Sequence, residues 1–473
     1  MAAPPERLAR RFLQIMTRSR RGHIGCGLLF VSGVAVAQAD GIACLDPAGP
    51  GAVFEATRYE EQFCRRPATA GDPWWFRLKN MSLGDASASI GGELRTRLED
   101  YRPVRAGLRG GRPDAYVTAR ALVHTDIQWG RWRAFGQIGY WDSFGRQGGP
   151  APTDVDRGDV QQLFVEWHGD GFVRAGRQEL LYGSGRLLGL RRSPNIRLTF
   201  DGARVGVPFV GGTLDLFHFR PVEIDPASWN NHQNSGERIA GMYYTRAPDA
   251  TGLGFDVYAF RFERDFQRYQ NAAGKDERNV AGVRFYGTAG RIDLNSELIL
   301  QGGRTAGEPV RAWSLQNDFV FKVDQDADWS LGLKANAASG DDNAGDRTFE
   351  TFQPIYAAPP YFMQSSLLTA ANITNLQPYA QWRPLLSLTL TAELQANWRM
   401  ETGDGYYQPP LVVQPLDRRG HYLASQAGLS MEWQVHPDLL VEAWASRFFV
   451  SNVLERAGGR DTTFVAWMVK WLF

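Results

Sequence analysis

The sequence predicts an all-β fold, a transmembrane antiparallel up-and-down β-barrel of about 18 strands. Three observations predict it: long segments alternate apolar with polar residues, charges share the polar face of these segments, and the chain ends on an aromatic alternating segment. The composition agrees, because 15 Trp, 16 Tyr and 51 Gly are what aromatic girdles and tight turns require. No apolar run of helix-spanning length exists in the body of the chain, which excludes a helical membrane protein.

The alternation is clearest from Leu386 to Arg399 and from Ala115 to Trp129, where apolar residues occupy every second position. Further alternating runs are Ile292 to Leu300, Trp329 to Ala337 and Leu423 to Val435. A soluble sandwich would give the same period. Strand length separates the two, because soluble strands average about five or six residues and a tilted strand that crosses a bilayer needs about ten.

Charge placement in the first strand gives the second observation. Its charged side chains share one face, at Glu93, Arg95, Arg97 and Glu99, and its apolar ones share the other, at Ile90, Leu94 and Leu98. Lipid cannot accept those charges, so the charged face should point into the lumen.

Connections of two lengths alternate along the chain. Short ones, suited to periplasmic turns, are expected at Gly130-Arg131, Gly169-Asp170, Val210-Gly211-Gly212, Gly290-Arg291 and His436-Pro437. Long extracellular loops are expected at 143–159, 220–236, 265–277, 303–311, 339–373 and 400–420.

The last strand should close the barrel onto the first. Its alternating residues end the chain, at Thr463, Val465, Trp467, Val469, Trp471 and Phe473. An open edge so aromatic would aggregate in water. A terminal strand of this kind resembles the recognition signal of bacterial outer-membrane barrels, which implies the barrel-assembly machinery as a partner.

Three regions are expected: a leader and signal peptide at 1–39, an N-terminal periplasmic segment at 40–87, and the barrel at 88–473. Arginines 18, 20 and 21 precede the apolar run 24–36, and small residues follow, as in a secretory signal. Two alternatives stay open, a start at Met16 and a twin-arginine signal. Cys26 falls in the signal. Cys44 and Cys64 remain, either as a disulfide or as two thiols.

The net charge of +1 argues against a nucleic-acid partner. Lysine occurs only at positions 79, 275, 322, 334 and 470, so arginine supplies most of the 52 basic residues. This bias reflects either a GC-rich genome or a passage whose guanidinium groups grip carboxylates or phosphates.

The segment 173–189 reads VRAGRQELLYGSGRLLG and the segment 197–204 reads RLTFDGAR. Both resemble the alginate-export family of outer-membrane proteins, and ETFQPIY at 350–356 with Tyr361 and Phe362 adds to the likeness. The resemblance covers the chain from about residue 85 to the end. It implies an 18-stranded monomeric barrel in the bacterial outer membrane, with an arginine-rich constriction through which an anionic polysaccharide leaves the cell.

The candidate pore-lining residues are charged side chains of the first strands and of the 173–204 region. They are Arg95, Arg97, Arg120, Arg174, Arg177, Arg186, Arg191, Arg197, Arg204, Glu179 and Asp201. A positive constriction in a low-dielectric wall concentrates anions. The alternative for each arginine is a carboxylate partner in a lumen-filling charge network.

Other functions receive less support from the sequence. A porin for small anions or carboxylates is the second transport hypothesis. A barrel enzyme would need a nucleophile beside a positioned base, and Ser446 and His421 show no such spacing. No cofactor is expected. The stretch Gly340 to Asp346 offers oxygen ligands for calcium, although a solvated acidic loop is commoner. Outer-membrane lipid and lipopolysaccharide should contact the wall, and a barrel with a blocked lumen would indicate a structural protein or adhesin.

Overall fold

The computed structural model describes residues 44–46, 54–324, 328–343, 345–358 and 362–473, and residues Gly33–Phe473 form one compact unit. The predicted signal peptide at 1–39, with Cys26 and the alternative start at Met16, lies outside the described residues. Among the helices in the described ranges, none is long and apolar enough to cross a membrane.

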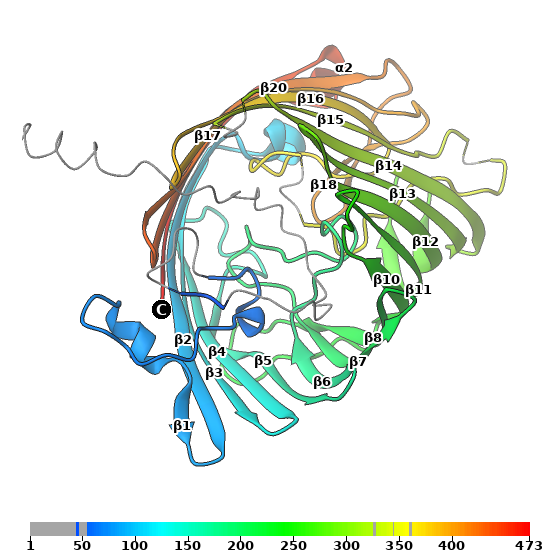
Figure 1. The fold of residues 1–473 in the computed structure, drawn as a ribbon. Coiled ribbons are helices and arrows are strands. Elements are labelled where there is room, and N and C mark those ends of the chain that lie inside the picture. Colours follow the sequence, from blue (N-terminus) through cyan, green and yellow to red (C-terminus); the bar gives the residue numbers. More distant parts are fainter. Residues whose placement is uncertain (1–43, 47–53, 325–327, 344, 359–361) are drawn as a thin grey trace, which may run out of the picture. The chain divides into compact units, whose positions relative to one another are not determined.

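The chain forms a closed antiparallel barrel of 18 strands, which confirms the predicted fold class (Figure 1). Closure is made by β2, which pairs with β3 on one side and with the last strand, β22, on the other. The barrel strands are β2 (Ala86–Arg102), β3 (Asp114–Trp129), β4 (Trp132–Phe144), β5 (Asp156–His168), β6 (Phe172–Gln178), β7 (Phe200–Phe209), β8 (Gly212–Glu223), β10 (Glu237–Arg246), β11 (Leu253–Arg268), β12 (Ala273–Ala289), β13 (Ile292–Thr305), β14 (Glu308–Lys322), β15 (Trp329–Ala338), β16 (Ile373–Leu385), β17 (Leu388–Trp398), β20 (Tyr422–His436), β21 (Leu439–Val450) and β22 (Thr462–Leu472).

The burial pattern of the wall is the reverse of that of a soluble protein. Leu94 and Leu163 are 49% and 59% exposed, while Glu93 and Arg95 are 1% and 2% exposed. Apolar side chains are normally the buried ones, so the outer face suits lipid and the polar face turns inward. The faces predicted for the first strand are therefore confirmed.

Exposed tryptophans collect at the end of the barrel where the short turns lie. They stand at the strand ends next to these turns, at Trp129, Trp132, Trp167, Trp329, Trp382 and Trp433. Trp329 and Trp382 stack across β15 and β16, with ring centroids 5.4 Å apart. Indole rings favour the boundary between lipid and water, so these side chains mark one interface of the membrane.

The turns predicted at residues 130, 169, 210, 290 and 436 all join consecutive strands at this end. The long loops expected at 265–277 and 303–311 are wrong. There β11 runs to Arg268 and β12 starts at Ala273, while Ala306 and Gly307 alone join β13 to β14. Both residues of that turn have positive φ, as a two-residue hairpin turn requires. Charged residues suggested loops because these strands continue beyond the apolar belt.

Three long connections at the opposite end pack into the lumen: residues 179–199 between β6 and β7, residues 339–372 between β15 and β16, and residues 399–421 between β17 and β20, which include β18 (Tyr406–Gln408) and β19 (Val412–Gln414). They meet an inward-facing aromatic wall on β8, β10 and β11, where Tyr243 and Tyr258 stack with centroids 5.0 Å apart. In this sector both faces of the strands are apolar, so the lumen is partly filled. Two further connections carry η3 (Val104–Gly110) and α2 (Asn452–Arg456), and β9 (His232–Gln233) extends β8.

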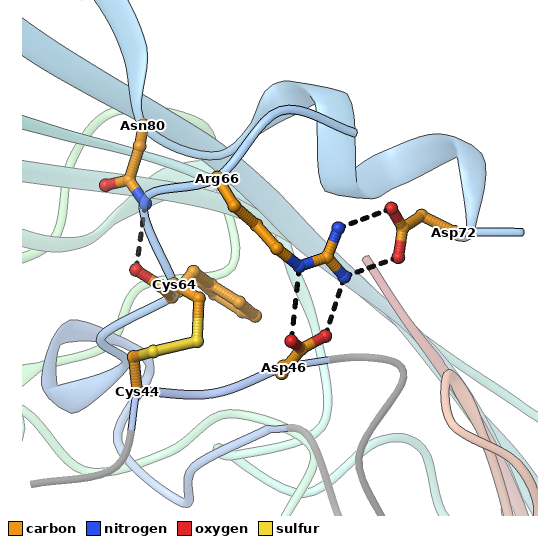
Figure 2. Close-up of a disulfide and its surroundings, with 7 residues drawn as sticks. Cys44, Asp46, Cys64, Arg66, Asp72 and Asn80 are labelled. Carbon is orange, nitrogen blue, oxygen red and sulfur yellow. Dashed lines mark hydrogen bonds and ion pairs between the residues drawn. A yellow bond between two sulfur atoms is a disulfide. The ribbon is translucent and has the colours of Figure 1, made fainter. Parts of the chain in front are cut away.

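The N-terminal segment contains η1 (Arg58–Glu60), η2 (Trp74–Leu78) and β1 (Met81–Leu83), and β1 pairs with the start of β2. Cys44 and Cys64 form a disulfide, so of the two alternatives the pairing is correct (Figure 2). Beside it, Arg66 bonds the carboxylates of Asp46 and Asp72 (Figure 2). These contacts give the segment a fixed fold of its own.

The same segment enters the short-turn end of the barrel. The Tyr59 ring packs edge-on against the inward-facing Phe135 and Phe164, at centroid distances of 6.1 and 5.5 Å. The Arg58 guanidinium donates to the backbone oxygens of Gly92 and Phe473, at 2.9 and 3.0 Å, and so bridges the seam between β2 and the chain end. The segment thus narrows this mouth of the lumen.

Candidate pore constriction

Residues 179–199, here called the constriction loop, cross the interior of the barrel. On one side, Asn195 Nδ2 donates to the backbone oxygens of Ala119, Asp142 and Asp154, at 2.9, 3.1 and 2.8 Å. On the other side, Arg186 donates to the backbone oxygens of Gln316 on β14 and Asn295 on β13, at 2.5 and 3.1 Å. The loop is therefore fixed to widely separated parts of the wall.

The sequence of the constriction loop explains this path. Leu180, Leu187 and Leu188 are buried against the aromatic wall, and their burial favours a loop folded inward over one that projects into water. Gly189 lies against the 339–372 loop, where it donates to Tyr356 O at 3.1 Å. A Cβ at Gly189 would stand 2.5 Å from Gly185 O, so only glycine permits this approach of the backbones.

A buried charge cluster holds the loop to β2 and β3. Glu93 accepts from Arg120 Nε at 3.0 Å and from Arg197 Nη2 at 3.1 Å, and Arg197 also reaches Glu179 at 3.3 Å. Arg120 further donates to Asn195 O at 2.9 Å. Each carboxylate offsets a guanidinium that burial would otherwise leave uncompensated. These predicted site residues face the lumen, but their side chains are buried and hold the constriction loop in place.

Three more of the predicted arginines point inward, and each of them also forms hydrogen bonds or an ion pair within the protein. Arg95 donates to the backbone oxygens of Arg192 and Pro194, at 2.7 and 3.2 Å. Arg97 pairs with Glu99 at 2.5 Å. Arg174 bonds Glu166 at 2.6 Å and lies over the Tyr59 ring. The lumen-filling network thus describes these side chains better than a bare cationic rim does.

Arg204 also faces the lumen. It pairs with Asp215 and lies over the rings of Phe172 and Tyr182, at 4.9 and 5.4 Å from their centroids. Its charge is therefore offset by a carboxylate on the neighbouring strand, β8.

Arg177 and Asp201 do not line the lumen, which corrects their assignment. In the register of the sheet Arg177 stands beside Leu163, a lipid-facing residue that is 59% exposed, and beside Asp201. Their side chains form a two-pronged pair on the outer face, at 2.9 and 3.1 Å. Residues three apart on a strand point to opposite faces, so Arg174 and Arg177 cannot both face inward.

Arg191 and Arg192, at the tip of the constriction loop, are differently placed. Among the described residues neither forms an ion pair, and Arg192 is exposed. Arg191 lines a small cavity with Arg186, Gln316 and Phe362, between the constriction loop and the 339–372 loop. Burial, together with the nearby Arg264, lowers the pKa of Arg191 to about 10, so it stays cationic at neutral pH. The neighbouring charged groups differ, because Arg191 lies near Glu237 and Arg264, whereas Arg192 lies near Glu432 and Glu442.

The opposite wall carries carboxylates that the sequence reasoning missed: Glu393 on β17, Glu432 on β20 and Glu442 on β21. Glu432 is exposed within the lumen. Their inward direction follows from the alternation with Leu394 and Leu429, which face lipid. Glu393 lies one residue from Leu394 and Glu432 three from Leu429, and such odd spacings place a side chain on the face opposite to the leucine.

A cavity of about 360 Å³ lies at the short-turn mouth, between the N-terminal segment and β3 to β5. Its lining includes Glu61, Arg65, Asp126, Arg133 and His168. This mixed charge would wet the entrance beneath the constriction loop.

Ser446 and His421 form no catalytic pair. Ser446 accepts from Gln426 Nε2 at 2.9 Å, and His421 Nδ1 contacts Arg399 O at 3.0 Å, with no hydrogen bond between the two side chains in the described ranges. The calcium site at 340–346 stays a prediction. In the part of the chain that the structure describes, no group of three His, Cys, Asp or Glu residues is placed to hold a metal ion.

A closed barrel with lipid-facing apolar residues and a polar, loop-constricted interior defines an outer-membrane channel of the bacterial envelope. Comparison with protein families identifies it further. The family model described as alginate export matches residues 86–467, and the chain belongs to that family. Among curated proteins, none matches this sequence.

Solved structures with the same fold are outer-membrane proteins of Pseudomonas aeruginosa. OpdQ is 14% identical, with a TM-score of 0.56 over 83% of this chain and 99% of that chain. OpdK, solved with vanillate, is 12% identical, with a TM-score of 0.56 over 81% and 98%. OccK2 (OpdF), solved in complex with glucuronate, is 12% identical, with a TM-score of 0.54 over 82% and 98%.

Proposed function

We propose that this channel exports an anionic, alginate-like polysaccharide past the guanidiniums of Arg191 and Arg192. The observation that carries the proposal is that, among the described residues, neither Arg191, which the sequence predicted, nor its neighbour Arg192, which was not in the predicted set, forms an ion pair at the constriction. The other inward arginines of the predicted set are bonded. A polyanion that passes here would exchange water for charge-assisted hydrogen bonds. Family membership supports a polymeric substrate.

The second candidate is a channel for small carboxylates. It is favoured by the partly filled lumen and by two structures of the same fold that were solved with vanillate and with glucuronate. Both are small carboxylates, and one is the kind of sugar acid from which acidic polysaccharides are built. Under either function, we propose that the barrel is a monomer and that the barrel-assembly machinery inserts it.

Reversal potentials in planar bilayers under a salt gradient test the role of the arginines. The wild type should prefer anions, and R191Q/R192Q should lose most of that preference, because neutralising the two charges removes the local positive potential. The matched control R246Q/R447Q removes two arginines from the outer wall and should leave selectivity unchanged. Cation preference in the wild type would overturn the proposal.

Block of the current by uronate oligomers distinguishes polymer from monomer. For a polysaccharide channel, the dwell time should lengthen with oligomer length, because successive carboxylates occupy the constriction together. For a small-carboxylate channel, monomer and oligomer should differ little, or long oligomers should fail to enter.

A further inference from the structure

The outer wall carries a basic band at its extracellular end, on strands β6 to β14. It consists of Arg177, Arg220, Arg238, Arg261, Arg304 and Arg311, all on the lipid-facing side of their strands. Arg238 and Arg261 are 50% and 53% exposed at the side chain, and Arg304 and Arg311 are exposed as well. Nothing in the proposed conduction path uses these residues.

The band follows two neighbouring rows of the sheet register. In the sheet register Arg177 faces Asp201, which faces Arg220 on the next strand. On β10 to β13 the same row continues through Arg238, Glu263, Glu277 and Arg304. Arg261 and Arg311 lie two residues closer to the membrane centre, in the next row.

One row further toward the centre, the wall becomes apolar. Leu216, Met242, Leu300 and Trp313 are 47%, 49%, 52% and 38% exposed there. The change from apolar to charged side chains takes place over about two to four residues of each strand, on the order of 7 to 14 Å along the chain. Such a step marks the plane where acyl chains end and head groups begin.

The charges of the band are only partly offset. Asp201 bonds Arg177 at 2.9 Å, and Glu263 bonds both Arg238 and Arg261 at 2.6 Å. In contrast, the hydrogen bonds of the Arg220 and Arg304 guanidiniums go to backbone oxygens, of Ser235 at 2.5 Å and of Gly307 at 3.1 Å. Positive charge is therefore in excess at the head-group plane.

This excess is confined to one side of the barrel. At the extracellular ends of β15, β16, β17 and β20, the lipid-facing row consists of Ala337, Thr374, Trp398 and Tyr422, which carry no charge. On β2 and β21 the lipid-facing Arg102 and Arg447 are each offset by a carboxylate, that of Asp100 at 2.7 Å and that of Asp461 at 3.4 Å. A barrel that needed charge only for solubility would have no reason to concentrate it on one side. The asymmetry instead indicates a ligand of opposite charge.

We propose that the basic band binds the phosphate groups of a phosphorylated glycolipid of the outer leaflet, with its acyl chains on the apolar rows below. A guanidinium grips phosphate oxygens in a two-pronged geometry, and basic clusters at a head-group plane bind anionic lipids. The exposed leucines, Met242 and Trp313 lie where the acyl chains of the same molecule would run. One amphiphilic molecule can therefore contact the arginines with its phosphates and the apolar rows with its acyl chains, whereas a free anion can contact only the arginines.

Native mass spectrometry of the purified full chain in detergent tests the proposal, with bisphosphorylated lipid A, its dephosphorylated form and inorganic phosphate as probes. The test variant is R220Q/R304Q/R311Q. The matched control R131Q/R246Q/R291Q removes three arginines at the opposite end. Circular dichroism verifies that both variants keep the barrel.

The wild type and the control should bind bisphosphorylated lipid A, and the test variant should bind it about tenfold or more weakly, as the loss of three charges at a lipid surface predicts. Dephosphorylated lipid should bind all three proteins alike and weakly. Equal affinity of test variant and wild type for the phosphorylated lipid would overturn the proposal, and so would displacement of the lipid by millimolar inorganic phosphate. Conduction is not measured, so either result leaves the proposed transport function standing.

Discussion

The substitution Glu93→Gln tests whether the buried charge cluster holds the constriction loop. The Glu93 carboxylate is 1% exposed and bonds both Arg120 and Arg197. Gln keeps the shape of the side chain and removes its charge, which leaves Arg120 with no carboxylate partner and Arg197 with Glu179 alone. Removal of one partner from a buried ion pair costs about 3–5 kcal/mol. The 18-stranded wall can survive that loss, so the cost should fall on the docking of the loop.

A cost of about 3 kcal/mol corresponds to an opening equilibrium raised about a hundredfold. Hydrogen exchange reads this directly at the Ile196 amide, which donates to Thr153 O at 2.9 Å, and at the Gly189 amide, which donates to Tyr356 O at 3.1 Å. Protection of both amides should fall by about that factor in E93Q, while that of the β12 and β13 amides stays unchanged. The matched control E432Q neutralises a lumen carboxylate outside this cluster and should change neither. If Ile196 kept its protection in E93Q, the cluster would not be what holds the loop.

Three further outcomes are expected. Burial raises the pKa of Asp341, in the 339–372 loop, to about 6, and the charges of Asp404 and Asp346 add to the rise. Because the folded loop favours the protonated carboxyl, it is most stable at low pH and loses that stability as the pH rises from about 4 to 6. D341N should therefore protect this loop from hydrogen exchange at pH 7.5 and make no difference below pH 4, and a difference that is constant with pH would contradict the assignment. Reduction of the disulfide between Cys44 and Cys64, which are 20 residues apart, should weaken the docking of the N-terminal segment by about 3 kcal/mol. Single-channel conductance should therefore rise when reductant is added. C44S/C64S should have the higher conductance without reductant, and reductant should not change it. G189V places side-chain atoms against Gly185 O and should expose the Tyr356 and Gly189 amides to exchange. The control G71V, at an exposed position where an added Cβ has no atom within 4 Å, should leave them protected.

Most of the barrel strands could be predicted from the alternation of apolar and polar residues at every second position. The alternation from Ala115 to Trp129 coincides with β3, and that from Trp329 to Ala337 with β15, because one face must meet lipid and the other must not. The alternation did not identify the parts of the strands that lie beyond the apolar belt, which were predicted as loops. There neither face meets lipid, so the residues of β11 to β14 lose the contrast that distinguishes a strand from a loop.

The candidate site was predictable only in part. The arginine-rich segment was found, but its division between the two faces was not, although the odd spacing of Arg174 and Arg177 already contains that information. The inward fold of the constriction loop depends on the aromatic wall of β8, β10 and β11, whose contacts are distant in sequence. The partners of Arg95, the backbone oxygens of Arg192 and Pro194, likewise arise only when the loop is docked.

The bridge that Arg58 makes across the seam has a consequence for the order of assembly. Its two acceptors, the oxygens of Gly92 and Phe473, belong to the first strand and to the last residue of the chain. These two acceptors come together only after β22 has paired with β2. The N-terminal segment is synthesised before the barrel strands, yet Arg58 can make both hydrogen bonds only after the last strand has paired with β2. A barrel that has not closed would therefore lack this contact at its short-turn mouth.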